Sequence, residues 1–329
     1  MTRRFTIFIL IVAGLFGQIA ESGAATPGRP VSPAPASTDH VILFVLEGLD
    51  RQSLKTGPMP ALSRLAKEGA ATWSAGTVTS PSRLPAMASL LTGLPVEKHG
   101  ITWDTFEFSR GYPRPPTVFD YLDLSGGRDS AIFFMDESLY QLAKPEPYTD
   151  YQVCGPLKPE CSPERLVAYV KQYVRKAASG QGYGHAILAL PHLLVVHLPD
   201  GARAGIEHGW SSGQYRTALR SVDRAMEAVL AIFNDHGLLG RTTVFVTSLS
   251  GTGAAQGETS TLSTTIPWIA SGAGIKPGHT IQQPVSIVDT GATVLRAFRL
   301  ETHTEWESRA VEEIFRETPG VATIPAKGR

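Results

Sequence analysis

The stretch from His40 to Asp50 reads HVILFVLEGLD and contains an uninterrupted apolar run that ends at Leu46. A continuous apolar run of this length predicts a strand that is buried on both faces, as in a parallel sheet covered by helices. A charged residue, Glu47, follows the run directly. Because ligands of open α/β sheets bind beyond the carboxyl ends of the strands, we expect a functional site at Glu47 and at the ends of neighbouring strands.

Strands and helices alternate along the rest of the chain. Further apolar runs predict buried strands at 130–134, 193–198, 243–247 and 266–270. Proline starts, glycine stops and helical spacing of apolar residues predict helices at 60–69, 162–174, 219–233 and 290–298. This alternation predicts an α/β fold, a three-layer sandwich with a mainly parallel central sheet covered by helices on both faces. Without internal repeats or an interior linker, residues 40–329 are predicted to form a single domain.

Composition restricts the possible partners. The chain has 329 residues, of which 42% are apolar, and a domain of this size buries about 75% of the surface of its unfolded chain. Neither disulfides nor metals are therefore needed for stability. The 30 basic and 30 acidic side chains cancel, so there is no electrostatic reason to expect nucleic acid or an anionic membrane as a partner.

The N-terminus predicts export. Arg3 and Arg4 precede the apolar run 5–16, and small residues follow up to Ala25, a pattern that predicts a signal peptide over residues 1–25 and a periplasmic or secreted protein. The run is shorter than the roughly 20 apolar residues of a spanning helix. An uncleaved anchor stays an alternative, and only then do we expect the membrane as a partner. Residues 26–39, rich in proline and small polar residues, are expected to form a linker.

Two cysteines, Cys154 and Cys161, lie close together in the sequence CGPLKPEC. In an oxidising compartment such a pair is typical of a local disulfide, and two free thiols are the alternative. Metal binding by these cysteines alone is not expected, because a structural zinc ion takes four ligands.

Several blocks resemble the type I phosphodiesterase and nucleotide pyrophosphatase branch of the alkaline phosphatase superfamily. The stretch HVILFVLEGLD resembles the opening strand of that family, and LPAMASLLTGLPVEKHGI (84–101) resembles the helix after its nucleophile, with the Thr-Gly and His-Gly-Ile signatures. The remaining blocks follow in the family's order: PTVFDYL (116–122), LLVVHLPDGARAGIEHGW (193–210), TVFVTSLSG (243–251), TIPWIASGAGIK (265–276), SIVDTGATVLRAF (286–298) and VEEIF (311–315). The resemblance covers roughly residues 40–315 and implies an alkaline phosphatase-like fold.

The resemblance also implies a reaction, hydrolysis of phosphate or related esters by a serine or threonine nucleophile between two divalent cations, usually zinc. Here Glu47 stands at the place of the family's first aspartate ligand and Arg83 at the place of its nucleophile. The other ligand positions fall on Ala202, Ile206, Leu249, Ser250 and Gln256. Alanine, isoleucine and leucine have no lone pairs, and neutral serine and glutamine oxygens are poor zinc ligands. The fixed positive charge of Arg83 would raise the energy of a unit positive charge 4 Å away by about 4 kcal/mol, at an effective dielectric constant of about 20. We therefore expect no metal cofactor and no two-metal mechanism.

These substitutions predict an exported, non-catalytic member of the superfamily that binds an anionic small molecule or an envelope protein. Arg83 is expected at a helix N-terminus, where free amides and a guanidinium can hold phosphate, sulfate or a carboxylate. The alternative is an internal ion pair between Arg83 and Glu47, and the sequence leaves both open. The alternative function is a metal-dependent phosphoric-ester hydrolase, with zinc as its cofactor and Ser82 as a substitute nucleophile.

Three further patterns are each given a structural interpretation. Thr79, Ser80 and Ser82 are expected to form a polar loop that leads into a helix N-terminus, where serine and threonine cap free amides. A one-ion site of Glu47, Asp200, His208 and Glu258 would match no known spacing, so solvated loop residues are expected instead. Residues 209–213 (GWSSG) match a serine-hydrolase motif that requires a strand directly before it, and the predicted strand ends too early, so Ser211 or Ser212 is expected to cap a helix.

Overall fold

The computed structural model describes residues 38–79, 82–143, 149–152, 161–183, 186–187, 189–253, 262–302 and 304–316. They belong to one compact unit, Pro35–Arg329. None of the helices among them combines the length and the apolar character that crossing a bilayer requires. The signal peptide, nearly all of the linker and Cys154 lie outside the described residues, so export and the disulfide to Cys161 stay predictions.

The core of the fold is a mixed sheet with the strand order β10-β2-β9-β8-β1-β7-β3-β4. The strands are β1 His40–Leu46, β2 Ala70–Gly76, β3 Ser130–Phe134, β4 Thr149–Gln152, β7 Leu193–Leu198, β8 Thr242–Ser248, β9 Thr265–Gly272 and β10 His279–Thr280. Strands β8, β1, β7, β3 and β4 run parallel to one another, whereas β9 runs antiparallel to both β8 and β2. The mainly parallel sheet is confirmed. A separate small sheet pairs β5 Gly182–Tyr183 with β6 Ala186–Ile187.

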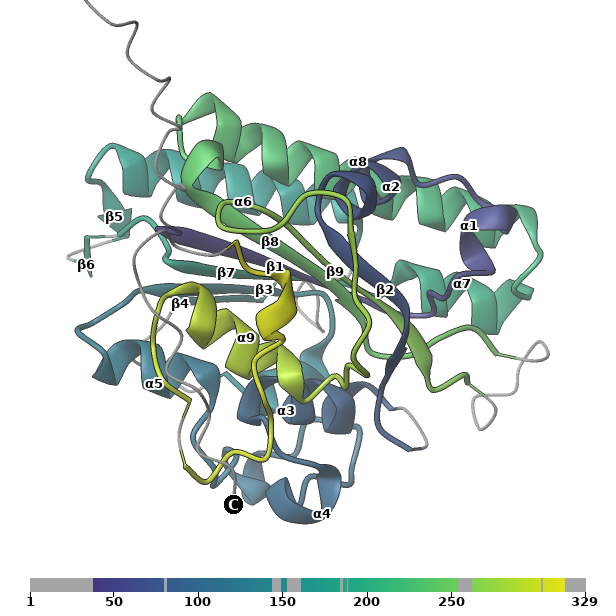
Figure 1. Cartoon of the computed structure of the whole chain (residues 1–329), viewed down its shortest axis with the longest axis horizontal. Coiled ribbons are helices and arrows are strands. Elements are labelled where there is room, and N and C mark those ends of the chain that lie inside the picture. Colours follow the sequence, from purple (N-terminus) through teal and green to yellow (C-terminus); the bar gives the residue numbers. More distant parts are fainter. Residues whose placement is uncertain are drawn as a thin grey trace, which may run out of the picture. The chain divides into compact units, whose positions relative to one another are not determined.

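Helices cover both faces of the sheet, as Figure 1 shows for α6 and α8 on one face and α3, α5 and α9 on the other. The α-helices are α1 Ser53–Thr56, α2 Pro60–Glu68, α3 Arg83–Thr92, α4 Val96–His99, α5 Val118–Leu124, α6 Pro163–Ala178, α7 Asp200–His208, α8 Gly213–Asp235 and α9 Asp289–Ala297. The short 3-10 helices are η1 Phe108–Arg110, η2 Glu137–Gln141, η3 Leu239–Arg241 and η5 Glu312–Ile314. All four predicted helices are present, and the three-layer sandwich is confirmed.

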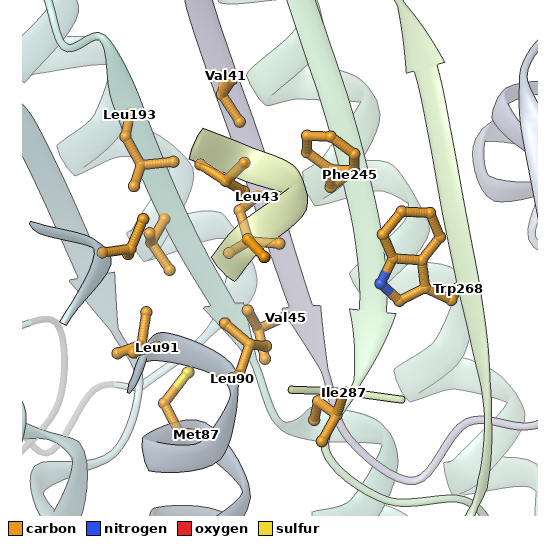
Figure 2. Packing of buried hydrophobic residues seen from close by; sticks show 14 of the residues in the cluster. Val41, Leu43, Val45, Met87, Leu90, Leu91, Leu193, Phe245, Trp268 and Ile287 are labelled. Atoms are coloured by element: carbon orange, nitrogen blue, oxygen red, sulfur yellow. The ribbon is translucent and has the colours of Figure 1, made fainter. Parts of the chain in front are cut away.

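Strand β1 lies inside the sheet and is buried along its whole length. Val41, Leu43 and Val45 point to one face, where they pack with side chains from α3, β7, β8 and β9 (Figure 2). Ile42 and Phe44 point to the opposite face and join the core under α6 and α8. Because alternate residues of β1 enter the apolar cores on the two faces of the sheet, every residue from Val41 to Leu46 is apolar. This uninterrupted apolar run is the pattern from which the strand was predicted.

Strand β2 was missed by the sequence analysis. It reads AATWSAG, in which alanine, serine and glycine have low strand propensity. Its strand conformation comes from the hydrogen-bonded neighbours β9 and β10. Tertiary pairing here overrides the local preference of the sequence.

The register of the parallel strands brings their carboxyl ends together. Leu46 of β1 pairs with Leu198 of β7 and with Ser248 of β8, and β3 pairs with the far side of β7. The residues that follow these strands therefore meet at one edge of the sheet. This edge is where the sequence predicted the site.

Candidate functional site

Helix α3 carries Arg83 to the carboxyl edge of the sheet. The helix begins at Arg83, and the amide of Leu84 donates a hydrogen bond to Asp104 Oδ1 at 2.6 Å. Ser82 has the backbone conformation of a cap, but its side chain makes no capping hydrogen bond. The prediction that Ser82 caps this helix is therefore wrong, because the stronger acceptor, a carboxylate, takes the free amide. Ser80 lies outside the described residues.

The guanidinium of Arg83 is surrounded by carboxylates. Its Nε donates to Glu47 Oε1 at 2.6 Å and its Nη2 to Glu47 Oε2 at 3.0 Å. Its Nη1 lies 2.8 Å from Asp136 Oδ2. Side-chain exposure is 6% for Glu47 and 21% for Arg83, so the bidentate pair is largely withdrawn from solvent. Of the two alternatives for Arg83, the internal ion pair is present.

A buried histidine completes the environment of Glu47. His197, on β7, is fully buried, and its Nε2 lies 2.7 Å from Glu47 Oε1. Its Nδ1 accepts a hydrogen bond from the amide of Met135 at 3.3 Å. Because Nδ1 is an acceptor, Nε2 carries the proton and donates to Glu47. Burial lowers the pKa of His197, although Glu47 acts in the opposite direction, so the imidazole is neutral at neutral pH.

The mutual attraction of Arg83, Glu47 and Asp136 keeps all three side chains ionised. Burial alone would raise the pKa of Glu47, but Arg83 and the hydrogen bond from His197 outweigh burial and lower it to about 2. Burial also acts to raise the pKa of Asp136, and Arg83 again outweighs it, so this pKa is lowered. For Arg83 burial acts to lower the pKa, and Glu47 and Asp136 raise it above its usual value. Both acids and Arg83 are charged across the physiological range.

A second arginine extends the ion pairs toward α7. Arg203 Nη2 lies 3.4 Å from Asp136 Oδ2 and also donates to the carbonyl of Met135. Its Nη1 is 3.2 Å from Cys161 Sγ. Acidic and basic side chains thus alternate from β1 through α3 and the end of β3 to α7. We call Glu47, Arg83, Asp136, His197 and Arg203 the site network.

An indole fills the space beside this network. A Cβ on Gly48 would lie 2.7 Å from the backbone of Ala202 and 2.8 Å from the ring of Trp210. A Cβ on Gly205 or Gly253 would also come within 3.0 Å of the Trp210 ring. Real Cβ atoms do not approach other atoms so closely. The Trp210 ring can therefore occupy this space only because glycine stands at these three positions. The ring therefore packs against Gly48, the residue that follows Glu47 in the chain.

The residues at the expected ligand positions do not fit two divalent cations. Both oxygens of Glu47 face Arg83, whereas buried Ala202 and Leu249 and half-buried Ile206 offer no donor atom. Ser250 Oγ accepts a hydrogen bond from the Gly48 amide at 3.2 Å. Gln256 lies outside the described residues. Within the described part of the chain, no group of three His, Cys, Asp or Glu side chains is arranged to hold a metal ion.

The alternative one-ion site is not assembled from its described members. His208 is exposed at the end of α7, 3.6 Å from Glu207, and Glu258 lies outside the described residues. Asp200 begins α7, and its Oδ2 is buried without a hydrogen-bond partner in the part of the chain that the structure describes. Burial raises the pKa of Asp200 to about 6, although Arg203 acts to lower it.

The serine motif at 209–213 is a helix start. Helix α7 separates it from β7, so no strand leads directly into it. Ser212 Oγ accepts a hydrogen bond from the amide of Tyr215 at 3.0 Å and caps α8. The capping prediction for Ser212 is confirmed.

Sequence reasoning missed three members of the site network, Asp136, His197 and Arg203. Two of them carried a readable signal. Asp136 follows a predicted strand by two residues, and His197 is the only polar residue in the apolar run LLVVHL. Applying the carboxyl-end rule to every predicted strand would have found Asp136.

Comparisons with known proteins extend these observations. Residues 41–267 match the family model described as type I phosphodiesterase / nucleotide pyrophosphatase. Murine ectonucleotide pyrophosphatase / phosphodiesterase 5 has a similar structure, with a TM-score of 0.65 and 12% identity over 84% of this chain and 100% of that chain. A putative sulfatase from Bacteroides thetaiotaomicron is similar with a TM-score of 0.63 and 13% identity over 84% of this chain and 75% of that one. At these identities the likeness shows the fold alone. No curated protein matches the sequence.

Proposed function

The chain belongs to the type I phosphodiesterase / nucleotide pyrophosphatase family of the alkaline phosphatase superfamily, and from this premise we propose that it is a non-catalytic, exported binding protein. The observation that carries the proposal is the bidentate pair between Arg83 and Glu47. Arginine stands where the family has its nucleophile, and a guanidinium stays protonated and cannot attack phosphorus. Glu47, the carboxylate at the family's first ligand position, has both of its oxygens hydrogen-bonded to Arg83.

The environment of Arg83 favours a macromolecular partner over a small anion. Each nitrogen of the guanidinium already faces an oxygen of Glu47 or Asp136, and Asp104 adds a third carboxyl nearby. An incoming phosphate or sulfate would have to displace one of these carboxylates and would meet the charge of the others. We therefore propose a partner protein outside the cytoplasm, and we expect no metal cofactor.

Export rests on the N-terminal sequence. The basic start, the apolar run 5–16 and the small residues up to Ala25 support cleavage of a signal peptide and a periplasmic or secreted location. In such a compartment the pair Cys154 and Cys161 would form a disulfide.

A hydrolysis assay tests the loss of catalysis. We expect the purified protein to hydrolyse chromogenic phosphodiesters and phosphomonoesters no faster than background, with zinc or manganese added, because the described part of the chain assembles neither an activated nucleophile nor a metal site. The competing function is a hydrolase with Ser82 as nucleophile. Turnover that a chelator and Ser82→Ala both abolish, and that Ser211→Ala leaves unchanged, would establish that function instead. Ser211 is a suitable control because it is an exposed serine outside the site network.

A further inference from the structure

Exposed aromatic side chains gather on one loop. Phe106, Phe108 and Tyr112 are 43%, 86% and 44% exposed. In the described part of the chain, one other large apolar side chain is as exposed, Leu124 on α5 at 79%. We call residues 103–114, which lie between α4 and α5, the aromatic loop.

Hydrogen bonds fix the backbone of this loop to the domain. Asp104 accepts from the amide of Leu84 at the start of α3, and the amide of Glu107 donates to Gln141 Oε1 at 2.9 Å. The Nε2 of Gln141 donates back to the carbonyl of Gly111. Because three hydrogen bonds hold the loop, its backbone is fixed in a conformation that exposes the aromatic rings to solvent.

The charges of the loop are mostly compensated within the protein. Arg110 lies 4.3 Å above the ring of Trp103, and its Nε is 2.5 Å from Glu107 Oε2. Asp104 holds the first amides of α3. Arg114 is exposed and adds a positive charge at the end of the loop. The loop therefore carries exposed aromatic rings and arginine side chains, and each of its two acids has a partner within the protein.

We propose that the aromatic loop inserts Phe106, Phe108 and Tyr112 into the interface of a phospholipid membrane. At roughly 200 Å² per aromatic side chain, the exposed fractions amount to about 350 Å². This area is less than half of the about 800 Å² per partner that a stable protein interface buries. A membrane interface requires no complementary surface, since it accepts single protruding aromatic rings. The exposed guanidinium of Arg114 suits the lipid phosphates.

The inference is independent of the proposed function. It rests on the exposure and fixation of the aromatic loop, whereas the proposed function rests on the site network. Hydrolysis of esters by this protein would leave it unchanged. Because the chain has no net charge, the expected attraction is apolar and does not require anionic lipid.

Flotation with phosphatidylcholine vesicles tests the inference on the full chain as it is exported. We expect the protein to float with the vesicles, and the triple variant Phe106→Ser, Phe108→Ser, Tyr112→Ser to bind at least about tenfold more weakly, because most of the buried apolar area is lost. The control is Leu124→Ser, which removes a 79% exposed apolar side chain outside the loop and should bind as the wild type does.

A second measurement covers the case in which the signal segment is not cleaved and its apolar run alone keeps the chain on vesicles. Trp103 lies in the aromatic loop and is one of five tryptophans. Bromine-labelled lipid should therefore quench part of the tryptophan fluorescence of the wild type, and the triple variant should lose this quenching. Equal binding and equal quenching of the wild type and the triple variant would overturn the proposal. Absence of vesicle binding, together with self-association that the triple variant abolishes, would overturn it in favour of a second copy as the partner.

Discussion

Arg83→Met is expected to lower the free energy of unfolding by about 3–5 kcal/mol, measured by urea denaturation at neutral pH. The substitution keeps an unbranched apolar stem but removes the guanidinium group and its charge. Glu47 and Asp136 then remain as largely buried carboxylates without their main counter-ion. Leaving a buried charge uncompensated costs more than an exposed ion pair contributes.

The pH dependence of this effect follows from the pKa of Glu47, which the folded state lowers from 4.5 to about 2. A lowered pKa contributes stability that is complete above pH 4.5 and is lost as the pH falls toward 2. The advantage of the wild type over Arg83→Met should decline in that window. Combining Arg83→Met with Glu47→Gln should recover part of the loss, because one of the uncompensated charges is removed.

Arg296→Met is the matched control, because Arg296 forms an exposed ion pair with Glu312 in which the side chains are 42% and 61% exposed. We expect a loss of no more than about 1 kcal/mol for this variant. A loss of similar size for Arg83→Met would show that the bidentate pair with Glu47 is not a buried ion pair in solution.

Gly48→Ala is expected to lower the free energy of unfolding by about 2–5 kcal/mol or to prevent folding. Gly48 has a φ of +68°, where an L side chain costs about 1–2 kcal/mol. The added methyl group would also lie 2.7 Å from backbone atoms of Ala202 and 2.8 Å from Trp210. Overpacking of this kind typically costs a further 1–3 kcal/mol. Thermal and urea unfolding of the variant measure the total.

Gly100→Ala separates the two contributions. Gly100 has a similar φ of +73°, but nothing lies within 4 Å of a Cβ built on it. Its substitution should therefore cost only the conformational term of about 1–2 kcal/mol. If both variants lose the same stability, Ala202 and Trp210 do not close on Gly48, and the space beside the site network is open.

Much of the fold could be predicted because buried parallel strands have a distinctive sequence. The strands β1, β3, β7 and β8 are buried along their whole length and consist mostly of apolar residues, since both faces of these strands are covered. Strand β2 could not be predicted, because its alanines and serine acquire strand structure only from β9 and β10. The antiparallel direction of β9 is likewise set by pairing that the sequence does not reveal.

The site could be predicted only in part. Glu47 and Arg83 were found because each lies at a recognisable place relative to a strand or a helix. Asp136 and His197 approach them from β3 and β7, which are far away in sequence, so their contacts depend on the register of the sheet. The packing of Trp210 against three glycines depends on three different segments and leaves no local pattern. Whether Arg83 binds an anion or pairs with Glu47 could therefore not be decided from sequence.

The central proposal is that the Arg83–Glu47 pair stands where the family binds its two cations, so that the chain holds no pair of metal ions. Equilibrium dialysis of the exported protein against micromolar zinc, followed by mass-spectrometric metal analysis, tests it most directly. We predict substoichiometric zinc that does not change the unfolding temperature. Two tightly held zinc ions per chain that raise the unfolding temperature would contradict the account, because the Arg83–Glu47 pair would then have to open to admit them.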